Sequence, residues 1–417
     1  MTRPTQSRHS QPHHCHLPYF TVQNGQLQAG KQSISQLSQQ LGSTPFYAYD
    51  SHLIEQRIQF LRNALPKAIR LHYAVKANPL PVLVQRLASK VDGLDIASKG
   101  ELALALQTGI NPRNISFTGP GKDTSELQAA ISAGVTLNIE SVAEMRNIAM
   151  LAENNALRPQ VTLRVNPDFS LKSSGMHMGG GATPFGIDAE QVPAALKELA
   201  TLNVEFLGFH IFAGSQNLHA NAIIDAQNAT LTLAIQLSEH APAPVRLLNM
   251  GGGFGIPYFP GEKPLDIEPI AENLLQIAEQ AKIALPEAEL ALELGRYLVG
   301  EAGIYVCRVL DKKISQGQTF LITDGGLHQH LAASGNFGQV IRKNYPVVIA
   351  NKMSEEKTAV VNIVGRLCTP LDLLANKVEL PIAEVGDLVV ILQSGAYGLS
   401  ASPTAFLSHP LPAEILL

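Results

Sequence analysis

The sequence is poor in cysteine, with three residues of this type among 417. Cys15, Cys307 and Cys368 are odd in number, lie far apart and lack the spacing of metal ligands. This arrangement excludes a disulfide framework of the kind found in small secreted domains, and it predicts no metal site. A reducing compartment fits these cysteines, so we expect a cytoplasmic protein.

Charge is also scarce. Charged residues make up 16% of the chain, the formal net charge is −4, and no long basic run occurs. Nucleic acids and anionic membranes attract proteins through clustered lysine and arginine, so neither partner is predicted. The hydrophobic share of 45% is ample for a sizeable core. The composition therefore predicts a large α/β domain with a smaller partner domain, and a small-molecule substrate.

Long apolar runs are missing as well. The segment from Met1 to His16 is polar and rich in histidine, without the apolar centre of a secretory signal. No later stretch is long enough to span a membrane. We expect a disordered tail over residues 1–16, with metal binding by its histidines as the alternative.

Short β-rich runs alternate with stretches rich in Ala, Leu, Glu and Gln from Thr44 to about Ile304. Repeated strand and helix units of this length require a parallel sheet, and about eight of them suggest a closed (β/α)8 barrel over residues 46–304. A doubly wound open sheet is the alternative. The strand-like runs are IRLHYAVKA, DGLDIAS, NISFTG, VTLNIE, VTLRVNP, VEFLGFHIF and VRLLNMGGG.

After Gly303 the pattern changes to strand-like runs separated by Gly, Pro and Asp turns. These runs predict a mostly β second domain, similar to a sandwich or barrel, over residues 305–417. The strand-like run TVQNGQLQA near Thr21 could join the same sheet, so residues 17–45 are assigned to this discontinuous domain. The later runs are IYVCRVLDKKI, TFLITDGG, VVIA, TAVVNIVG and DLVVILQ.

Three segments fall at predicted C-terminal strand ends, where barrel enzymes place their catalytic groups. Lys76 in HYAVKANP is either a surface residue or a buried amine whose pKa falls, as a Schiff-base lysine requires. The glycines of NMGGGFG, residues 249–255, allow backbone N–H groups to approach an anion, although such a run is commonly only a turn. Glu293 and Arg296 in LELGRYLVGEAG either form ion pairs with neighbours or face a ring nitrogen and a phosphate.

In this order, the segments resemble the alanine-racemase-type (fold type III) barrel class of pyridoxal-phosphate enzymes, specifically the ornithine and diaminopimelate decarboxylase family. The match runs from about Thr44 to Leu407. The resemblance implies α-decarboxylation of an amino acid with pyridoxal 5'-phosphate as cofactor, Lys76 as the Schiff-base lysine and Glu293 paired with the pyridine nitrogen. The other cofactor-binding positions that it implies are Asp95, Arg164, Phe212, Ser215, Gly252, Gly253, Arg296 and Tyr397.

The resemblance also assigns a catalytic cysteine to the second domain. The family's CxxxD-type motif, which comes from the other subunit, reads CTPLD here, and it implies that Cys368 donates a proton to the carbanion. By itself, a cysteine on a β-rich segment is more often a buried small hydrophobe. The same carry-over implies a homodimer with two shared active sites, because neither chain is complete alone.

Three departures from the family pattern bear on the substrate. The residue after the cysteine, usually an acid that receives the distal amino group, is Thr369, and Asn336 falls where diamine enzymes carry a second acid. A distal ammonium without a partner in a desolvated pocket costs roughly 1 to 3 kcal/mol or more. Counted without gaps, the arginine that holds the distal carboxylate of diaminopimelate falls at Ala332.

The third departure lies in GFHIFAGSQ, where relatives commonly stack a histidine on the cofactor ring. Phe212 stands at that position, with His210 two residues earlier, so stacking is kept but hydrogen bonding is lost. We assign His210, Thr369, Asp372 and Asn336 to substrate binding. The neutral distal end predicts an acylated or conjugated substrate, as in CTPLD-type decarboxylases that act on carrier-bound glutamyl groups or on citrate-conjugated amino acids of siderophore assembly.

Other functions remain as alternatives. A meso-diaminopimelate decarboxylase of lysine biosynthesis is predicted if the specificity segment is misaligned. An amino-acid racemase needs a second acid/base on the opposite face, typically a tyrosine, and the CTPLD motif favours decarboxylation instead. Small non-catalytic pyridoxal-phosphate-binding proteins lack the β domain, and a purely structural barrel leaves the phosphate motifs unexplained.

Overall fold

The computed structural model describes residues 13–16, 18–170, 175–177 and 179–417. Eight parallel strands form a ring in which β15 pairs back onto β5, which confirms the closed barrel and excludes the open sheet. A ninth short strand, β11 (Ile187–Asp188), extends this sheet beside β9. The ring consists of β5 (Ile69–Ala74), β6 (Gly93–Ile96), β7 (Ile115–Phe117), β8 (Thr136–Ile139), β9 (Gln160–Asn166), β12 (Glu205–Ile211), β14 (Leu247–Gly252) and β15 (Glu289–Leu294).

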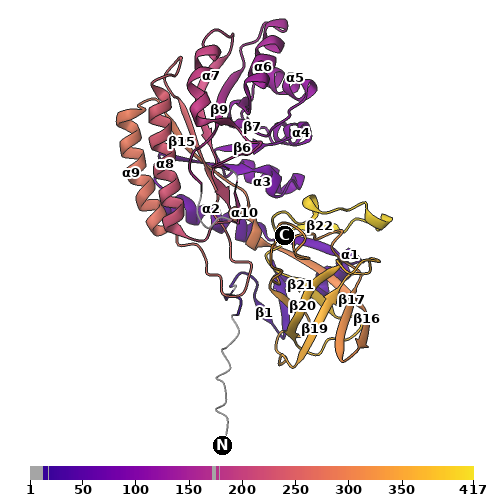
Figure 1. Ribbon diagram of the computed structural model, residues 1–417. Helices are drawn as coiled ribbons and strands as arrows, with labels where there is room; N and C mark the ends of the chain where they lie inside the picture. Colours follow the sequence, from indigo (N-terminus) through magenta and orange to yellow (C-terminus); the bar gives the residue numbers. More distant parts are fainter. Residues whose placement is uncertain (1–12, 17, 171–174, 178) are drawn as a thin grey trace, which may run out of the picture.

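Helices surround the ring, as Figure 1 shows. Four of them begin at side-chain caps, because Asp50, Ser98, Asp123 and Ser141 each accept a hydrogen bond from the backbone N–H three residues later. The barrel helices are α2 (Ser51–Ala64), α3 (Pro81–Ala88), α4 (Lys99–Gln107), α5 (Thr124–Ala133), α6 (Val142–Asn154), α7 (Val192–Leu199), α8 (Ala220–Ser238), α9 (Glu268–Ala284) and the short α10 (Arg296–Val299).

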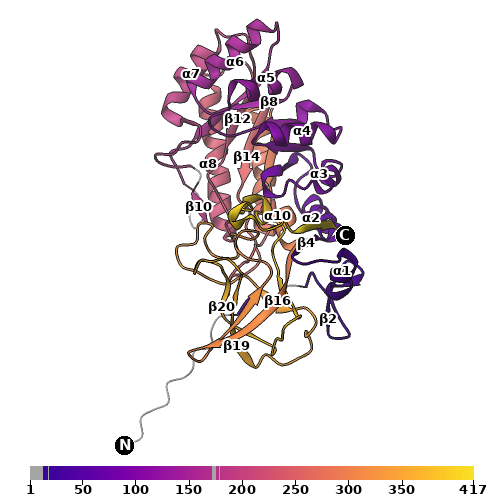
Figure 2. The same cartoon turned by 90° about the vertical axis from the view of Figure 1, so that its right-hand side faces the viewer.

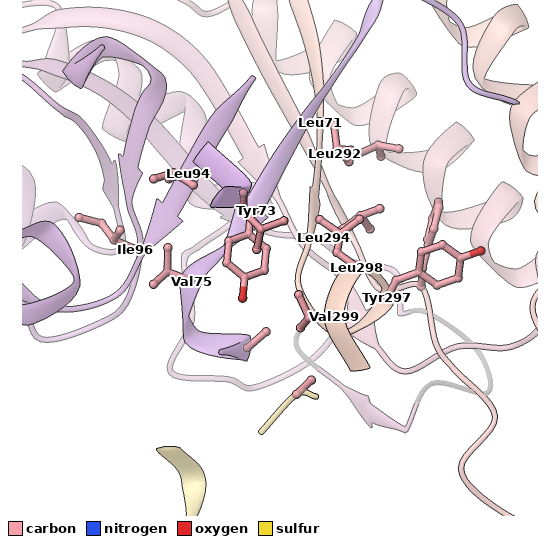
Figure 3. Packing of buried hydrophobic residues seen from close by; sticks show 14 of the residues in the cluster. Leu71, Tyr73, Val75, Leu94, Ile96, Leu292, Leu294, Tyr297, Leu298 and Val299 are labelled. Carbon is pink, nitrogen blue, oxygen red and sulfur yellow. The ribbon is translucent and has the colours of Figure 1, made fainter. Parts of the chain in front are cut away.

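The two faces of the ring strands have different environments. Leu71 and Tyr73 of β5 and Leu292 of β15 are buried in the hydrophobic core (Figure 3). Because successive side chains of a strand point to opposite faces, His72 and Glu293 lie on the inner face of the ring. Both are buried as well, so the interior of this barrel is polar where the site is built.

A second body of mostly antiparallel strands lies below the barrel in Figures 1 and 2. It confirms the predicted β domain. Its strands come from before and after the barrel in the sequence, since β4 pairs with β16 and with β22. Its strands are β4 (Phe46–Tyr49), β16 (Gly303–Ser315), β17 (Gln318–Thr323), β18 (Val347–Ile349), β19 (Ala359–Val364), β20 (Leu373–Leu380), β21 (Leu388–Ile391) and β22 (Ala413–Leu416).

The run near Thr21 does not extend this large sheet. It forms a three-stranded sheet of its own with β1 (Val22–Gln23), β2 (Gln26–Ala29) and β3 (Gln32–Ser33), followed by α1 (Ile34–Leu41). A backbone hydrogen bond of 2.8 Å from Leu27 to Ala350 joins it to the β domain. We propose on this basis that the β domain is discontinuous, as the sequence predicts.

The predicted tail is described only in part. Residues 1–12 lie outside the described residues, whereas the carbonyl of His13 accepts a hydrogen bond of 2.9 Å from the N–H of Gly261. Two further short strands, β10 (Met176–His177) and β13 (Gly214–Ser215), pair beside the barrel. Among the described helices, none combines the length and the apolar character needed to cross a membrane.

Candidate active site

Lys76 lies directly after β5, in a single turn of 3-10 helix over Val75–Ala77. Its Nζ is 3.5 Å from Oδ2 of Asp95 and 3.5 Å from Oε1 of Glu293. The lysine side chain is 37% exposed, but those of the two acids are 0% and 4% exposed. The lysine side chain is therefore partly exposed, while both of its charge partners are buried.

The charges of this cluster determine its protonation. Burial alone would lower the pKa of Lys76, but the carboxylates of Asp95 and Glu293 raise it well above its ordinary value. The expectation of a lowered pKa is therefore wrong for the chain without cofactor, because two acids flank the amine. Burial also acts to raise the pKa of Glu293, yet the charge of Lys76 holds it well below its ordinary value, whereas burial and the charge of Glu293 raise that of Asp95.

A line of hydrogen bonds inside the ring holds Asp95. Ser116 of the neighbouring strand β7 and Thr118, which directly follows that strand, donate to its Oδ1, Ser116 at 3.2 Å. Asn138 donates to Thr118, and Thr162 donates to Asn138. The sequence analysis missed these supporting residues, although polar side chains at alternate positions of NISFTG, VTLNIE and VTLRVNP were the signal for a polar inner face.

Glu293 has two polar neighbours on its other side. The Nε2 atom of His210 is 3.3 Å from its Oε2, and the side-chain amide of Asn249 donates to the same oxygen at 3.3 Å. His210 is only 1% exposed. The structure thus brings His210 to Glu293, and contact of His210 with a substrate stays a prediction.

The predicted phosphate-binding side chains offer hydrogen-bond donors. Among the described residues, the buried Oγ of Ser215 has no hydrogen-bond partner. Arg296, at the start of α10, donates to Oη of Tyr258 at 2.9 Å, and its guanidinium lies 4.6 Å from the ring centroid of Tyr397. Burial opposes the charge of Arg296, but tyrosines rather than carboxylates raise its pKa, so this cation is suited to receive an anion.

The glycine loop after β14 presents backbone rather than side chains. A Cβ atom on Gly252 would lie 2.1 Å from the carbonyl oxygen of Glu293, and Gly253 has a φ of +83°. A Cβ atom on Gly251 would lie 2.6 Å from the ring of Phe212, which therefore packs against the loop. The buried hydroxyl, the guanidinium and this loop fit a phosphate, and the amine of Lys76 fits an aldehyde. Together they fit pyridoxal 5'-phosphate.

Two further predicted residues lie at the edges of this cluster. Arg164 of β9 forms an ion pair of 2.7 Å with Glu140 and lies 4.8 Å from the ring centroid of Phe185. The backbone N–H of Tyr397 donates to the carbonyl of Ala77 at 2.8 Å. That bond connects the C-terminal part of the chain to the turn that carries Lys76.

The Cys368 loop belongs to the β domain. Cys368 is exposed, and the backbone N–H of Thr369 donates to Leu367 at 2.8 Å within the turn. The side-chain amide of Asn336 donates to the carbonyl of Leu371 in the same loop at 3.3 Å. Asp372 is 3% exposed. Across the described ranges, no hydrogen bond or ion pair joins Cys368 to the Lys76 cluster of its own chain.

A closed (β/α)8 barrel with an amine between two acids and a phosphate-fitting cradle defines a barrel-type pyridoxal-phosphate enzyme. Residues 51–300 match the family model described as pyridoxal-dependent decarboxylase, pyridoxal binding domain. The chain belongs to this family of decarboxylases, and its cofactor is pyridoxal phosphate. It decarboxylates an amino acid or an amino-acid conjugate, which confirms the enzyme class that the sequence predicts.

Similar proteins act on different members of this substrate class. The chain is 40% identical to L-glutamyl-(BtrI acyl-carrier protein) decarboxylase of Niallia circulans, covering 89% of this chain and 88% of the relative. It is 32% identical to 2-[(L-alanin-3-ylcarbamoyl)methyl]-2-hydroxybutanedioate decarboxylase of Staphylococcus aureus, with coverages of 92% and 96%. A crystal structure of diaminopimelate decarboxylase from Helicobacter pylori with L-lysine superposes with a TM-score of 0.82 at 26% identity, covering 92% and 94% of the chains.

Proposed function

We propose that this decarboxylase acts on an amino acid whose far end is covalently joined to another group and carries no free ammonium group. The observation that carries the proposal is the state of the only acid in the CTPLD loop. Both carboxylate oxygens of Asp372 accept backbone hydrogen bonds, and its side chain is buried, so it is not free to receive an ammonium group. Thr369 and Asn336 are neutral, which leaves a distal ammonium without a partner in this loop.

The named relatives support the same substrate class. One acts on a glutamyl group attached to a carrier protein, and the other on an alanine joined through a carbamoyl group to a hydroxybutanedioate. In both names the far end of the amino acid is covalently joined to another group. We propose a substrate of this kind, either carrier-bound or a conjugate such as a siderophore intermediate.

We assign the cofactor contacts as the sequence suggests. Lys76 is its covalent attachment point, Glu293 and Phe212 contact its ring, and Asp95 and Arg164 line the same cavity. When bound, pyridoxal phosphate takes up the electron pair that decarboxylation releases. In the chain without cofactor, the carboxylates of Asp95 and Glu293 raise the pKa of the Lys76 amine. We assign phosphate binding to Ser215, Gly252, Gly253, Arg296 and Tyr397.

Cys368 is the proposed proton donor to the α-carbon, and it acts in the site of a second copy of the chain. Because Cys368 is exposed and separate from the Lys76 cluster of its own chain, a homodimer with shared sites would complete both centres. Mixing Lys76→Ala and Cys368→Ala chains, neither of which should release the amine product alone, tests this directly. Random exchange should restore about a quarter of the wild-type rate of amine release, since half of the dimers are mixed and each contains one intact site. No recovery after confirmed subunit exchange would contradict sharing.

The substrate is tested by carbon-dioxide release from the cofactor-loaded enzyme. Diaminopimelate, ornithine and lysine are compared with carrier-bound glutamate and with citryl-conjugated diaminopropionate. Turnover restricted to a conjugate supports the proposal. Efficient turnover of free diaminopimelate would assign the enzyme to lysine biosynthesis instead.

A further inference from the structure

The loop that carries Cys368 is closed at its base by the backbone and by one carboxylate. The N–H of Gly365 donates to the carbonyl of Asp372 at 3.0 Å. The carboxylate of Asp372 then accepts the N–H of Leu367 at 2.9 Å and the N–H of Leu327 at 2.7 Å. Leu367 directly precedes Cys368, so this carboxylate fixes the residue from which the thiol projects.

Two glycines make room for this carboxylate. A Cβ atom on Gly365 would lie 2.1 Å from Oδ2 of Asp372, and one on Gly326 would lie 2.6 Å from its Oδ1. Neither glycine has a positive φ that would require glycine for backbone reasons. The space around Asp372, rather than the backbone conformation, therefore accounts for glycine at both positions.

The bonds of Asp372 reach two separate parts of the β domain. Gly326 and Leu327 follow β17, and Gly365 and Leu367 follow β19, which runs parallel to β17. One carboxylate thus joins the ends of two neighbouring strands. A carboxylate that accepts two N–H hydrogen bonds is among the stronger hydrogen-bonding arrangements in proteins. Because Asp372 is buried, water cannot readily replace these two bonds.

We propose that Asp372 is a positioning residue for the proton donor. Its carboxylate sets the conformation of the loop over residues 365–372 and so determines where Cys368 delivers its proton. The inference rests on the proposed role of Cys368, and it assigns to Asp372 a function other than substrate contact.

The carbon atom that receives the proton after decarboxylation determines which product forms. When carbon dioxide leaves, the bound cofactor would take up the electron pair, and a proton from Cys368 at the α-carbon would give the amine. If Cys368 is misplaced, the proton would be added at a carbon other than the α-carbon. Hydrolysis then yields a carbonyl compound, and the nitrogen stays on the cofactor. The amine released per carbon dioxide therefore measures the position of Cys368 rather than general stability.

The test compares Asp372→Asn and Gly365→Ala in the full-length, cofactor-loaded protein. Asparagine offers only one oxygen to the two N–H groups, and the added methyl group displaces the carboxylate without removing its charge. We expect amide hydrogen exchange at Leu327 and Leu367 to speed up roughly tenfold or more. The ratio of amine to carbon dioxide should fall below one.

Matched controls separate this effect from general damage. Asp387→Asn changes an aspartate of the same domain that accepts the N–H of Glu384 at 2.7 Å. Gly100→Ala adds a methyl group in α4, where its Cβ would lie 3.7 Å from Oγ of Ser98. Both should keep the ratio at one. Wild-type exchange and a ratio of one in both test variants would overturn the proposal. If Cys368→Ala itself keeps a ratio of one, the donor assignment fails, while exchange still reports whether Asp372 holds the loop.

Discussion

The Nε2 atom of His210 lies 3.3 Å from Oε2 of Glu293, and the two side chains are only 2% and 4% exposed. Glu293 therefore stands between a cation on one side, Lys76, and an imidazole on the other. Burial acts to raise the pKa of Glu293, whereas Lys76 and His210 lower it. A carboxylate held ionised in this way can keep a facing pyridine nitrogen protonated.

Replacing His210 by Gln should raise the pKa of Glu293 and weaken its ionised form. The Glu293 carboxylate then loses its electrostatic contact with the buried imidazole, and we expect kcat to fall roughly tenfold, which corresponds to about 1.4 kcal/mol. His330→Gln is the control, because this buried histidine contacts Ser394 in the β domain at 2.8 Å. Equal kcat values for the two variants would argue against a role of His210 through Glu293.

Lys76→Ala should abolish both turnover and the visible absorbance of the covalently bound cofactor. The reason is that the variant has no amine between Asp95 and Glu293. Absorbance spectra and carbon-dioxide release measure the two effects. Lys99→Ala, at an exposed position of α4, should change neither. Normal turnover of Lys76→Ala would refute the assignment.

Arg296→Gln and Ser215→Ala should weaken cofactor binding without changing the chemistry at the amine. Loss of a charged donor to a phosphate costs about 1.5 to 3 kcal/mol, which corresponds to a Kd raised roughly 10- to 100-fold. Spectroscopic titration of the apoenzyme with pyridoxal phosphate measures this Kd. Arg146→Gln, which removes an exposed ion pair with Glu198, serves as the control. An unchanged Kd in both test variants would place the phosphate elsewhere.

Thr369→Glu should shift the substrate preference towards free diamines. The new carboxylate would supply the partner that a distal ammonium lacks, so kcat/KM for ornithine or lysine should rise roughly tenfold while that for a conjugate falls. Thr369→Gln controls for size without charge. The proposal of a neutral distal end fails if both variants leave the ratio of the two kcat/KM values unchanged.

The free energy of unfolding should decrease as the pH falls below 6.5. Burial lowers the pKa of His72 from 6.5 to about 4 and that of His330 from 6.5 to about 3. Between these values the unfolded chain binds protons that the folded chain does not, so stability rises with pH across this window. Each histidine contributes a slope of up to about 1.4 kcal/mol per pH unit. Urea unfolding at pH 4.5 and 7.5 tests this, and His72→Gln should reduce the difference.

Much of the fold can be predicted because each barrel strand carries its own pattern. In IRLHYAVKA the large apolar side chains of Leu71 and Tyr73 alternate with His72 and lead to Lys76 at the strand end. Such a run predicts a strand between helices without any tertiary information. β20 was missed because LLANKVEL contains exposed polar residues and a positive φ at Lys377, which break the alternation.

The environment of an acid is harder to predict. Asp372 in CTPLD reads as a site residue, and nothing local shows that Gly326 and Gly365, from two other segments, enclose its carboxylate. The same holds for His210, whose partner Glu293 lies far away in the sequence. Sequence spacing locates strand ends, but the partners of a buried charge depend on which strands close the ring.

The polar line from Thr162 through Asn138 and Thr118 to Asp95 occupies the space that other barrels fill with apolar layers. The same side chains thus occupy the centre of the domain, and Thr118 among them also lowers the pKa of the acid beside Lys76. A substitution that improves packing here would also change the protonation of the reactive amine. In this barrel, the free energy of unfolding and the protonation of the reactive amine are therefore coupled.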